Sequence, residues 1–136
     1  MFSIGEVAKA TGLKVPTIRF YEQEGLLPAP ARTESNRRLY TEADIRRLTF
    51  IRHTRSLGFE LNDIRALLDL ADNPARPCGE ADAIARRQLA AVEERLQQLT
   101  ALKQELQRVS SACAGGKNAG ECRVIEALTV DAPFKV

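Results

Sequence analysis

The sequence predicts a mainly α-helical protein, with a winged helix-turn-helix DNA-binding domain at its start and a long dimerisation helix near its end. Two observations carry this prediction. Residues 79–112 contain no proline and no glycine after the first position, and their apolar residues recur every three or four positions, as on one face of a helix. Ahead of them, two short helical segments are joined by a tight glycine-containing turn and followed by a basic, turn-forming stretch.

Charge is distributed unevenly along the 136 residues. Met1–Gly58 holds ten Lys and Arg against six Asp and Glu, whereas Phe59–Val136 holds ten against twelve. A basic first half indicates an anionic partner for that half. Because the chain shows no signal peptide and no stretch of membrane-spanning length, we expect a cytoplasmic protein without a membrane partner. Three cysteines in a reducing compartment then favour thiolate chemistry or metal binding over disulfides.

The two short helices are predicted from their end signals. The first covers Ile4–Thr11, with Ser3 and Glu6 in the relation of a capping box and Gly12 at the position that ends it. The second covers Val15–Glu24. Its side chains, together with that of Lys14 just before it, include the hydroxyl, ammonium, guanidinium and phenol groups that hold phosphates and contact base edges. The candidate DNA contacts here are Lys14, Thr17, Arg19 and Tyr21.

A short β-hairpin is predicted next, within the stretch GLLPAPARTESNRRLYTEAD. Its prolines and its Ser-Asn turn suit two short strands joined by a tight turn. A basic hairpin that follows a helix-turn-helix is a wing, so it adds a second set of DNA contacts. The candidates on the wing are Arg32, Arg37, Arg38 and Tyr40.

Two further helices follow the hairpin. Thr41 and Asp44 form a second capping box, which opens a helix through Leu57 that Gly58 closes, and a shorter helix covers residues 62–71. On the longer of these two helices, we expect an inward face and an arginine-rich outward face, with one arginine as a candidate phosphate contact. The inward residues are Ile45, Leu48, Ile51 and Leu57, the outward ones are Arg46, Arg47, Arg52 and Arg55, and the phosphate contact is Arg55.

The long helix predicts a homodimer. A single apolar stripe cannot bury itself, and no other helix of the chain matches its length, so its simplest partner is its own copy in a coiled coil. In an antiparallel pair, Cys78 of one chain could meet Cys113 and Cys122 of the other. The stripe consists of Ile84, Leu89, Val92, Leu96, Leu99, Leu102, Leu106 and Val109.

These elements divide the chain into four predicted parts. The first is the DNA-binding domain, the second a hinge helix with its connector, the third the dimerisation helix, and the fourth a glycine-rich loop with a last helical turn. Their predicted boundaries are residues 1–58, 59–77, 78–112 and 113–136.

Most of the sequence resembles the MerR family of bacterial transcription regulators, through IGEVAKATGLKVPTIRFYEQEGLLPAPAR, NRRLYTEADIRRLTFIRHTRSLGFELNDIRALL and the long helix. The pattern TIRFYE…GLL…RLY is specific to that family. The resemblance implies a winged-helix DNA-binding domain, a hinge helix pair and an antiparallel coiled-coil homodimer. It also implies action with RNA polymerase on double-stranded promoter DNA: repression when the protein is empty, and activation by bending and untwisting the DNA when an effector binds.

The resemblance also implies a metal effector. Metal-sensing branches of that family have one cysteine before the coiled coil and two that flank a loop after it, and Cys78, Cys113 and Cys122 match these positions. Three thiolates suit a divalent soft ion, which favours cadmium, lead or mercury. Copper-sensing members usually have serine at the first position. Zinc-sensing members have adjacent cysteines and a loop histidine, whereas this chain has Ala114 and no histidine in its loop.

Other interpretations stay open. The effector could be zinc, or a non-metal signal such as thiol oxidation or an aldehyde. The cysteines could also be three unrelated buried residues. An enzyme is disfavoured, because no histidine or acid pairs sensibly with a cysteine nucleophile and no glycine-rich phosphate loop occurs. His53, the only histidine, is expected at the surface.

Overall fold

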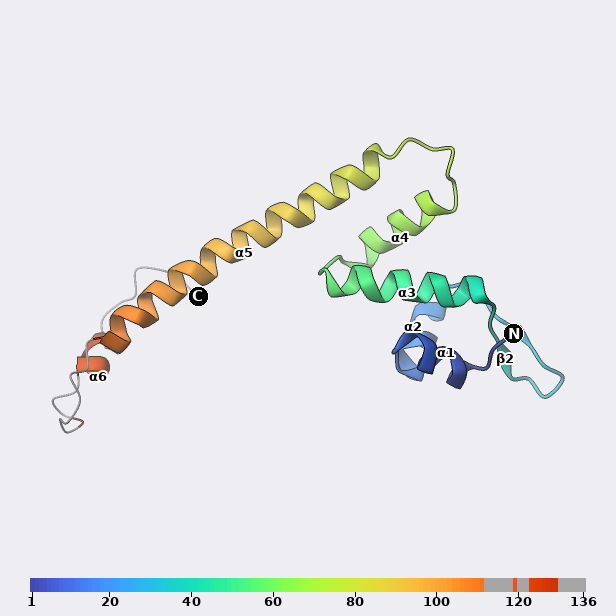
Figure 1. Ribbon diagram of the computed structural model, residues 1–136, viewed down its shortest axis with the longest axis horizontal. Coiled ribbons are helices and arrows are strands. Elements are labelled where there is room, and N and C mark those ends of the chain that lie inside the picture. The colour runs from blue at the N-terminus through green and yellow to red at the C-terminus, as the bar shows by residue number, and fades with distance from the viewer. Residues whose placement is uncertain (112–118, 120–122, 130–136) are drawn as a thin grey trace. The chain divides into compact units, whose positions relative to one another are not determined.

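The structure is a computed structural model of the chain, and it describes residues 1–111, 119 and 123–129. Within these residues the chain is helical apart from one small hairpin (Figure 1). It divides into two compact units, Met1–Ala85 and Arg86–Val136. The helices and strands are α1 (Ile4–Thr11), α2 (Val15–Gln23), β1 (Ala31–Arg32), β2 (Arg38–Leu39), α3 (Glu42–Ser56), α4 (Leu61–Ala71), α5 (Gly79–Ser111) and α6 (Arg123–Leu128).

The ends of α1 are set by local hydrogen bonds. The Glu6 N–H donates to the Ser3 hydroxyl oxygen (3.2 Å), and the Ser3 N–H donates to the Glu6 carboxylate (3.0 Å), which confirms the predicted capping box. Gly12 follows the helix with φ of 74°, a left-handed conformation that favours glycine, and its N–H donates to the Ala8 carbonyl. This turn leads directly toward α2.

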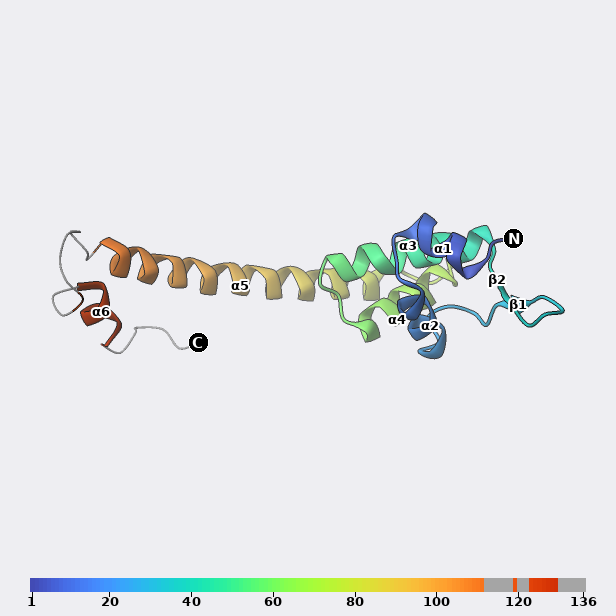
Figure 2. The ribbon, with the colours of Figure 1, turned by 90° about the horizontal axis from the view of Figure 1, so that it is seen from below.

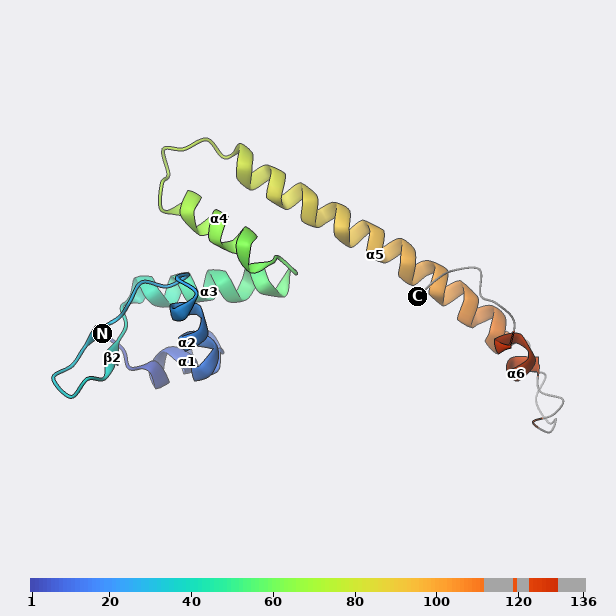
Figure 3. The same ribbon diagram turned by 180° about the vertical axis from the view of Figure 1, so that it is seen from behind.

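One hydrophobic core, mostly aliphatic, holds the first unit together. Figures 1 and 3 show α3 with α4 on one side and α1 and α2 on the other, and α1 packs on both α2 and α3. Burying each large apolar side chain contributes about 1.5–3 kcal/mol, so this cluster fixes the helix-turn-helix as a rigid body. Its buried members are Val7, Ile18, Tyr21, Leu26, Leu27, Tyr40, Leu48, Ile51, Ile64 and Leu68.

The predicted wing is present as an antiparallel hairpin. Ala31 pairs with Leu39 and Arg32 with Arg38, and Asn36 in the connecting turn has φ of 65°. Immediately after β2, Tyr40 and Phe2 exchange two backbone hydrogen bonds of 2.8 Å, so the base of the wing is tied to the start of the chain. Figure 2 shows the hairpin extending from the helices of this unit.

The helix α3 confirms the second capping box and corrects two expectations. Thr41 and Asp44 exchange the predicted hydrogen bonds, of 2.9 and 3.1 Å. Leu57 does not face inward: it is 51% exposed, because it caps the helix and lies beyond its last helical residue. Arg47 does not face solvent either, since its guanidinium reaches the Leu26 carbonyl and the Asp72 carboxylate.

The long helix α5 covers 33 residues, about 50 Å at the usual helical rise. Ile84 and Val109 are buried, but the middle of the predicted stripe lies exposed on the single chain. None of the described helices is both long and apolar enough to cross a membrane. The exposed members of the stripe are Leu89, Val92, Leu96, Leu99, Leu102 and Leu106.

Candidate functional site

The start of α2 presents polar groups to solvent. Lys14 is its N-cap residue and makes no side-chain cap hydrogen bond, so its exposed ammonium group is not used by the helix end. Thr17 is partly exposed in the first turn, and Arg19 is exposed in the second. The three side chains therefore reach the surface as the sequence predicted, on a helix held from behind by the buried Ile18.

A cavity of about 390 Å³ brings the cationic groups of α2 and the wing together. Arg19 contributes from α2, and Arg37 and Arg38 contribute from the wing. Arg32, on the other strand, is exposed and donates to the Asn36 carbonyl at the wing turn (3.1 Å). Three guanidinium groups around one cavity form a surface that attracts phosphate. The full lining consists of Ser3, Ile4, Arg19, Asn36, Arg37 and Arg38.

Two predicted DNA contacts lie in the hydrophobic core instead. Tyr40 has no exposed surface and Tyr21 retains only 7% of its own. Their aromatic rings pack against the aliphatic side chains of the core. Burying a ring in this way is more favourable than leaving it exposed on a charged surface. Our expectation of direct DNA contact is therefore corrected for Tyr40, and Tyr21 can offer only a small edge.

The buried end of Tyr40 belongs to a polar cluster that sequence reasoning missed. Its hydroxyl donates a very short hydrogen bond to one oxygen of Glu22, and the other oxygen accepts from Arg38 Nε at 3.1 Å. Burial raises the pKa of Tyr40, and the hydrogen bond to Glu22 and the charge of that carboxylate raise the pKa further. Glu22 follows Arg19 by three residues and so lies on the same face of α2. This spacing was the signal in the sequence that could have placed Glu22 near the cationic side chains.

Arg55 is not one of the residues that line this cavity. It lies exposed in the last turn of α3, where its guanidinium donates to the Phe59 carbonyl at 2.8 Å. The hydrogen bond ties the last turn of α3 to the segment that follows it and leaves other donors of the guanidinium open to solvent. Contact between Arg55 and phosphate stays a prediction.

Cys78 is the one predicted metal ligand among the described residues. It is a free, exposed thiol immediately before α5, and its carbonyl accepts from the Asp82 N–H at 3.1 Å in the first turn of that helix. Cys113 and Cys122 lie outside the described residues. Within the described part of the chain, no group of three or more His, Cys, Asp or Glu residues is arranged to hold a metal ion. The three-cysteine site therefore stays a prediction.

Comparison with known families decides what kind of protein carries this surface. Residues 2–71 match the family described as "MerR HTH family regulatory protein", and residues 45–109 match "MerR, DNA binding". The chain belongs to the MerR family. This confirms the predicted fold class, a mainly helical regulator with a helix-turn-helix, a small wing and a long C-terminal helix.

Similar proteins of the MerR family include metal-related regulators. The HTH-type transcriptional regulator ZntR of Escherichia coli (strain K12) is 42% identical over 130 residues, which cover 94% of this chain and 92% of that protein. The crystal structure of PbrR691 from Ralstonia metallidurans CH34 in complex with lead(II) is 42% identical, with a TM-score of 0.81 over 94% of this chain and 99% of that one. The Bacillus megaterium MB1 MerR structure with mercury(II) is 29% identical, with a TM-score of 0.70 over 95% and 100% of the two chains.

Proposed function

We propose that this MerR-family chain is a metal-responsive transcription regulator whose effector is a divalent soft ion: cadmium, lead or mercury. It binds its promoter as a homodimer, represses transcription when metal-free, and activates transcription by distorting the DNA when the ion binds Cys78, Cys113 and Cys122. The observation that carries this proposal is Cys78, an exposed free thiol directly before the long helix, in a chain 42% identical to a regulator crystallised with lead(II).

The chemistry of the donor set fits such an ion. Thiolates are soft ligands, and three of them balance a divalent soft cation better than a monovalent one. Cysteine must lose its proton to become a ligand, so we expect ion binding to release protons and to weaken as the pH falls. A bound ion would supply a link between Cys78 and the segment that contains Cys113 and Cys122.

The proposed DNA interface is the exposed surface of α2 together with the wing. A cavity that can receive a phosphate group is surrounded by Arg19, Arg37 and Arg38. This arrangement supports contacts to the DNA phosphate backbone from both α2 and the wing. The remaining proposed contacts are the exposed or partly exposed side chains of Lys14, Thr17, Arg32 and Arg55, together with the exposed edge of Tyr21.

Coupling between ion and DNA would act through the connector that contains Cys78. Arg76 in this connector pairs with Asp69 of α4 (2.7 Å) and Glu80 of α5 (3.4 Å), so the segment around Cys78 is tied to both helices. A link between the cysteine-bearing segments would favour one arrangement of the DNA-binding units in the dimer over another. A differential contact of this kind is what an effector needs in order to shift a conformational equilibrium.

The proposal is tested by replacing each cysteine with serine. We expect Cys78→Ser, Cys113→Ser and Cys122→Ser to bind the operator almost as the wild type does, but to lose activation by cadmium, lead and mercury in a purified transcription assay under reducing conditions. Ala83→Ser, an exposed change in the first turns of α5, is the matched control and should respond normally. Full activation of Cys78→Ser by all three ions would refute the three-thiolate site.

Zinc is the second candidate, since cysteine thiolates bind it and since ZntR is among the similar regulators. Zinc usually takes four ligands in a closed site, and three cysteines leave one position to another donor. Comparing zinc with the three soft ions in the same transcription assay distinguishes these candidates. Activation by an oxidant or an aldehyde without any metal would favour a thiol-reactive signal instead.

A further inference from the structure

Glu22 connects the second helix of the DNA-binding unit to its wing. Its carboxylate accepts from two donors on the far side of the hairpin, the Tyr40 hydroxyl and Arg38 Nε, which follow it by 18 and 16 residues. The side chain of Glu22 is 11% exposed and that of Arg38 is 27% exposed. A carboxylate this deeply covered is stable only because both of its oxygens are paired.

The wing needs such an anchor. Each of its strands has two residues, and a two-stranded ribbon alone is marginally stable in water. Its first strand leads into an exposed turn, whereas its second strand is held at Tyr40 by the backbone of Phe2 and by Glu22. The side chains of Arg38 and Tyr40 are thus the only described wing side chains with hydrogen bonds to α2.

We propose that Glu22 is a positioning residue for DNA recognition, which holds the wing against α2 and directs Arg38 so that the cationic groups of both elements face one phosphate backbone. This inference rests on the proposed DNA interface. In this role an acidic residue favours the binding of an anion. The affinity for DNA that Glu22 adds by positioning Arg38 and the wing exceeds the affinity that its negative charge removes.

The sign of the effect separates this role from simple electrostatics. A carboxylate beside Arg19 and Arg38 lowers the local positive charge, so charge alone predicts that removing it would strengthen DNA binding and steepen its salt dependence. A positioning role predicts the opposite, since the wing and Arg38 would lose their fixed direction. Tyr40 provides an independent check, because it has no exposed surface with which to touch DNA.

Glu22→Gln keeps the shape of the side chain and removes its charge. We expect it to bind an operator duplex about tenfold more weakly than the wild type, which corresponds to about 1.4 kcal/mol, and Tyr40→Phe to weaken binding in the same direction. Glu34→Gln, an exposed acid in the wing turn, is the matched control and should bind as tightly as the wild type or more tightly. Fluorescence anisotropy at several salt concentrations, well below each melting temperature, gives the affinities and slopes.

Hydrogen exchange provides a readout that does not depend on DNA. The backbone amides of β1 and β2 should exchange faster in Glu22→Gln than in the wild type, while those of the buried core in α3 should keep their protection. Operator binding by Glu22→Gln that equals or exceeds that of the wild type would overturn the inference. If Glu22→Gln does not fold, as judged by circular dichroism, wild-type affinity in Tyr40→Phe would overturn it instead.

The same experiment keeps the two proposals apart. Wild-type protein and Arg19→Ala, measured beside these variants, report on the DNA interface itself. If the wild type does not bind the duplex, or if Arg19→Ala binds unchanged, the proposed interface fails. If both behave as proposed and Glu22→Gln still binds normally, only the role of Glu22 fails.

Discussion

At the scale of single residues, a carboxylate, a guanidinium and a phenol satisfy one another at the base of the wing. Glu22 accepts from Arg38 and from Tyr40, and among the described residues no buried side-chain nitrogen or oxygen lacks a hydrogen-bond partner. Such a cluster is stable as a whole and costly to break in part, because each partner left alone would be a buried polar group without a hydrogen bond.

We predict that the Tyr40 phenol ionises only above the usual range of tyrosine. Burial and the Glu22 carboxylate raise its pKa. Its protonated form therefore stabilises the fold fully below about pH 10, and this contribution is lost as the pH rises through the raised pKa. The chain has two tyrosines and no tryptophan, so phenolate absorbance gives a clear measurement. The part of the absorbance change that occurs above the usual pH range of tyrosine should be absent from Tyr40→Phe. Complete ionisation of both tyrosines near pH 10 in the folded wild type would contradict the prediction.

Arg19→Ala should weaken operator binding at all sequences, because the proposed contact is to phosphate rather than to a base edge. Loss of one phosphate contact makes the negative slope of log affinity against log salt shallower by about one. Arg95→Ala removes the same exposed side chain from α5 and serves as the control. Anisotropy titrations at several salt concentrations measure both quantities, and an unchanged slope in Arg19→Ala would rule out the contact.

At the scale of helices and strands, two arginines hold the segment that leaves α2. Arg47 of α3 donates to the Leu26 carbonyl (2.6 Å) and to Asp72 (2.9 Å), the residue that caps the end of α4. Arg65 of α4 donates to the Glu24 carbonyl and pairs with its carboxylate at 3.5 Å. The end of the helix proposed to face DNA is therefore attached directly to α3 and α4.

Arg47→Ala should destabilise the protein by about 1–3 kcal/mol, mainly through the loss of the hydrogen bond to Leu26. The pair with Asp72 adds little, because that carboxylate is more than half exposed. Arg46→Ala, at the neighbouring exposed position, should change stability by less than about 0.5 kcal/mol. Urea unfolding compares the two variants, and equal midpoints would contradict the bridging role.

Local signals explain which parts of the fold the sequence could predict. The capping boxes at Ser3 and Thr41 involve residues three positions apart, so their hydrogen bonds follow from the sequence alone. Arg47 and Glu22 bond to partners 16 to 25 residues away, and helical periodicity contains no information about such pairs. Tyr40 was misplaced for the same reason, since its hydroxyl finds Glu22 only after the hairpin folds back onto α2.

The two candidate sites differ in how much of each could be predicted from the sequence. Cationic residues on α2 and the wing could be predicted as a group, because their elements follow one another in the chain. The metal ligands were predicted from the antiparallel pairing of two long helices and from family resemblance, since the whole length of α5 separates Cys78 from Cys113 and Cys122 in one chain. No rule of local structure brings such residues together, and the proposed site also needs a second chain.

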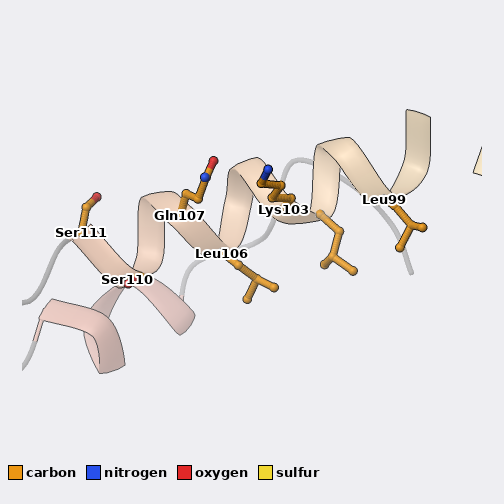
Figure 4. A pocket seen from close by; sticks show the side chains of 7 residues that line it. Leu99, Lys103, Leu106, Gln107, Ser110 and Ser111 are labelled. Atoms are coloured by element: carbon orange, nitrogen blue, oxygen red, sulfur yellow. The ribbon is translucent and has the colours of Figure 1, made fainter. Parts of the chain in front are cut away.

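At the scale of the whole molecule, the exposed stripe of α5 requires a partner. Leu99 and Leu106 project to the same side of the helix, whereas Gln107 and Ser111 project elsewhere (Figure 4). Leu99 is 56% exposed in the single chain, and the leucines around it line an open groove that also includes the stem of Lys103. An exposed apolar surface of this kind indicates an interface.

Leu99→Asp should convert the dimer to monomers, since it places a charge in the proposed seam between two copies of α5. Gln97→Asp introduces the same charge on the opposite face of the helix and should leave the dimer intact. Sedimentation at micromolar concentration measures the assembly, and operator binding should fall only in Leu99→Asp. A monomeric wild type would contradict both the pairing of the α5 helices and the metal site shared between two chains.

The exposed apolar stripe on α5 also affects the level of this regulator in the cell. If two chains must pair before they occupy a two-fold operator, occupancy at low abundance rises with the square of chain concentration. A chain that has not yet paired exposes six large apolar side chains, from Leu89 to Leu106, to chaperones and proteases. Proteolysis would then remove unpaired chains faster than dimers, so that the rate of synthesis, and not only the effector, decides when the promoter is held.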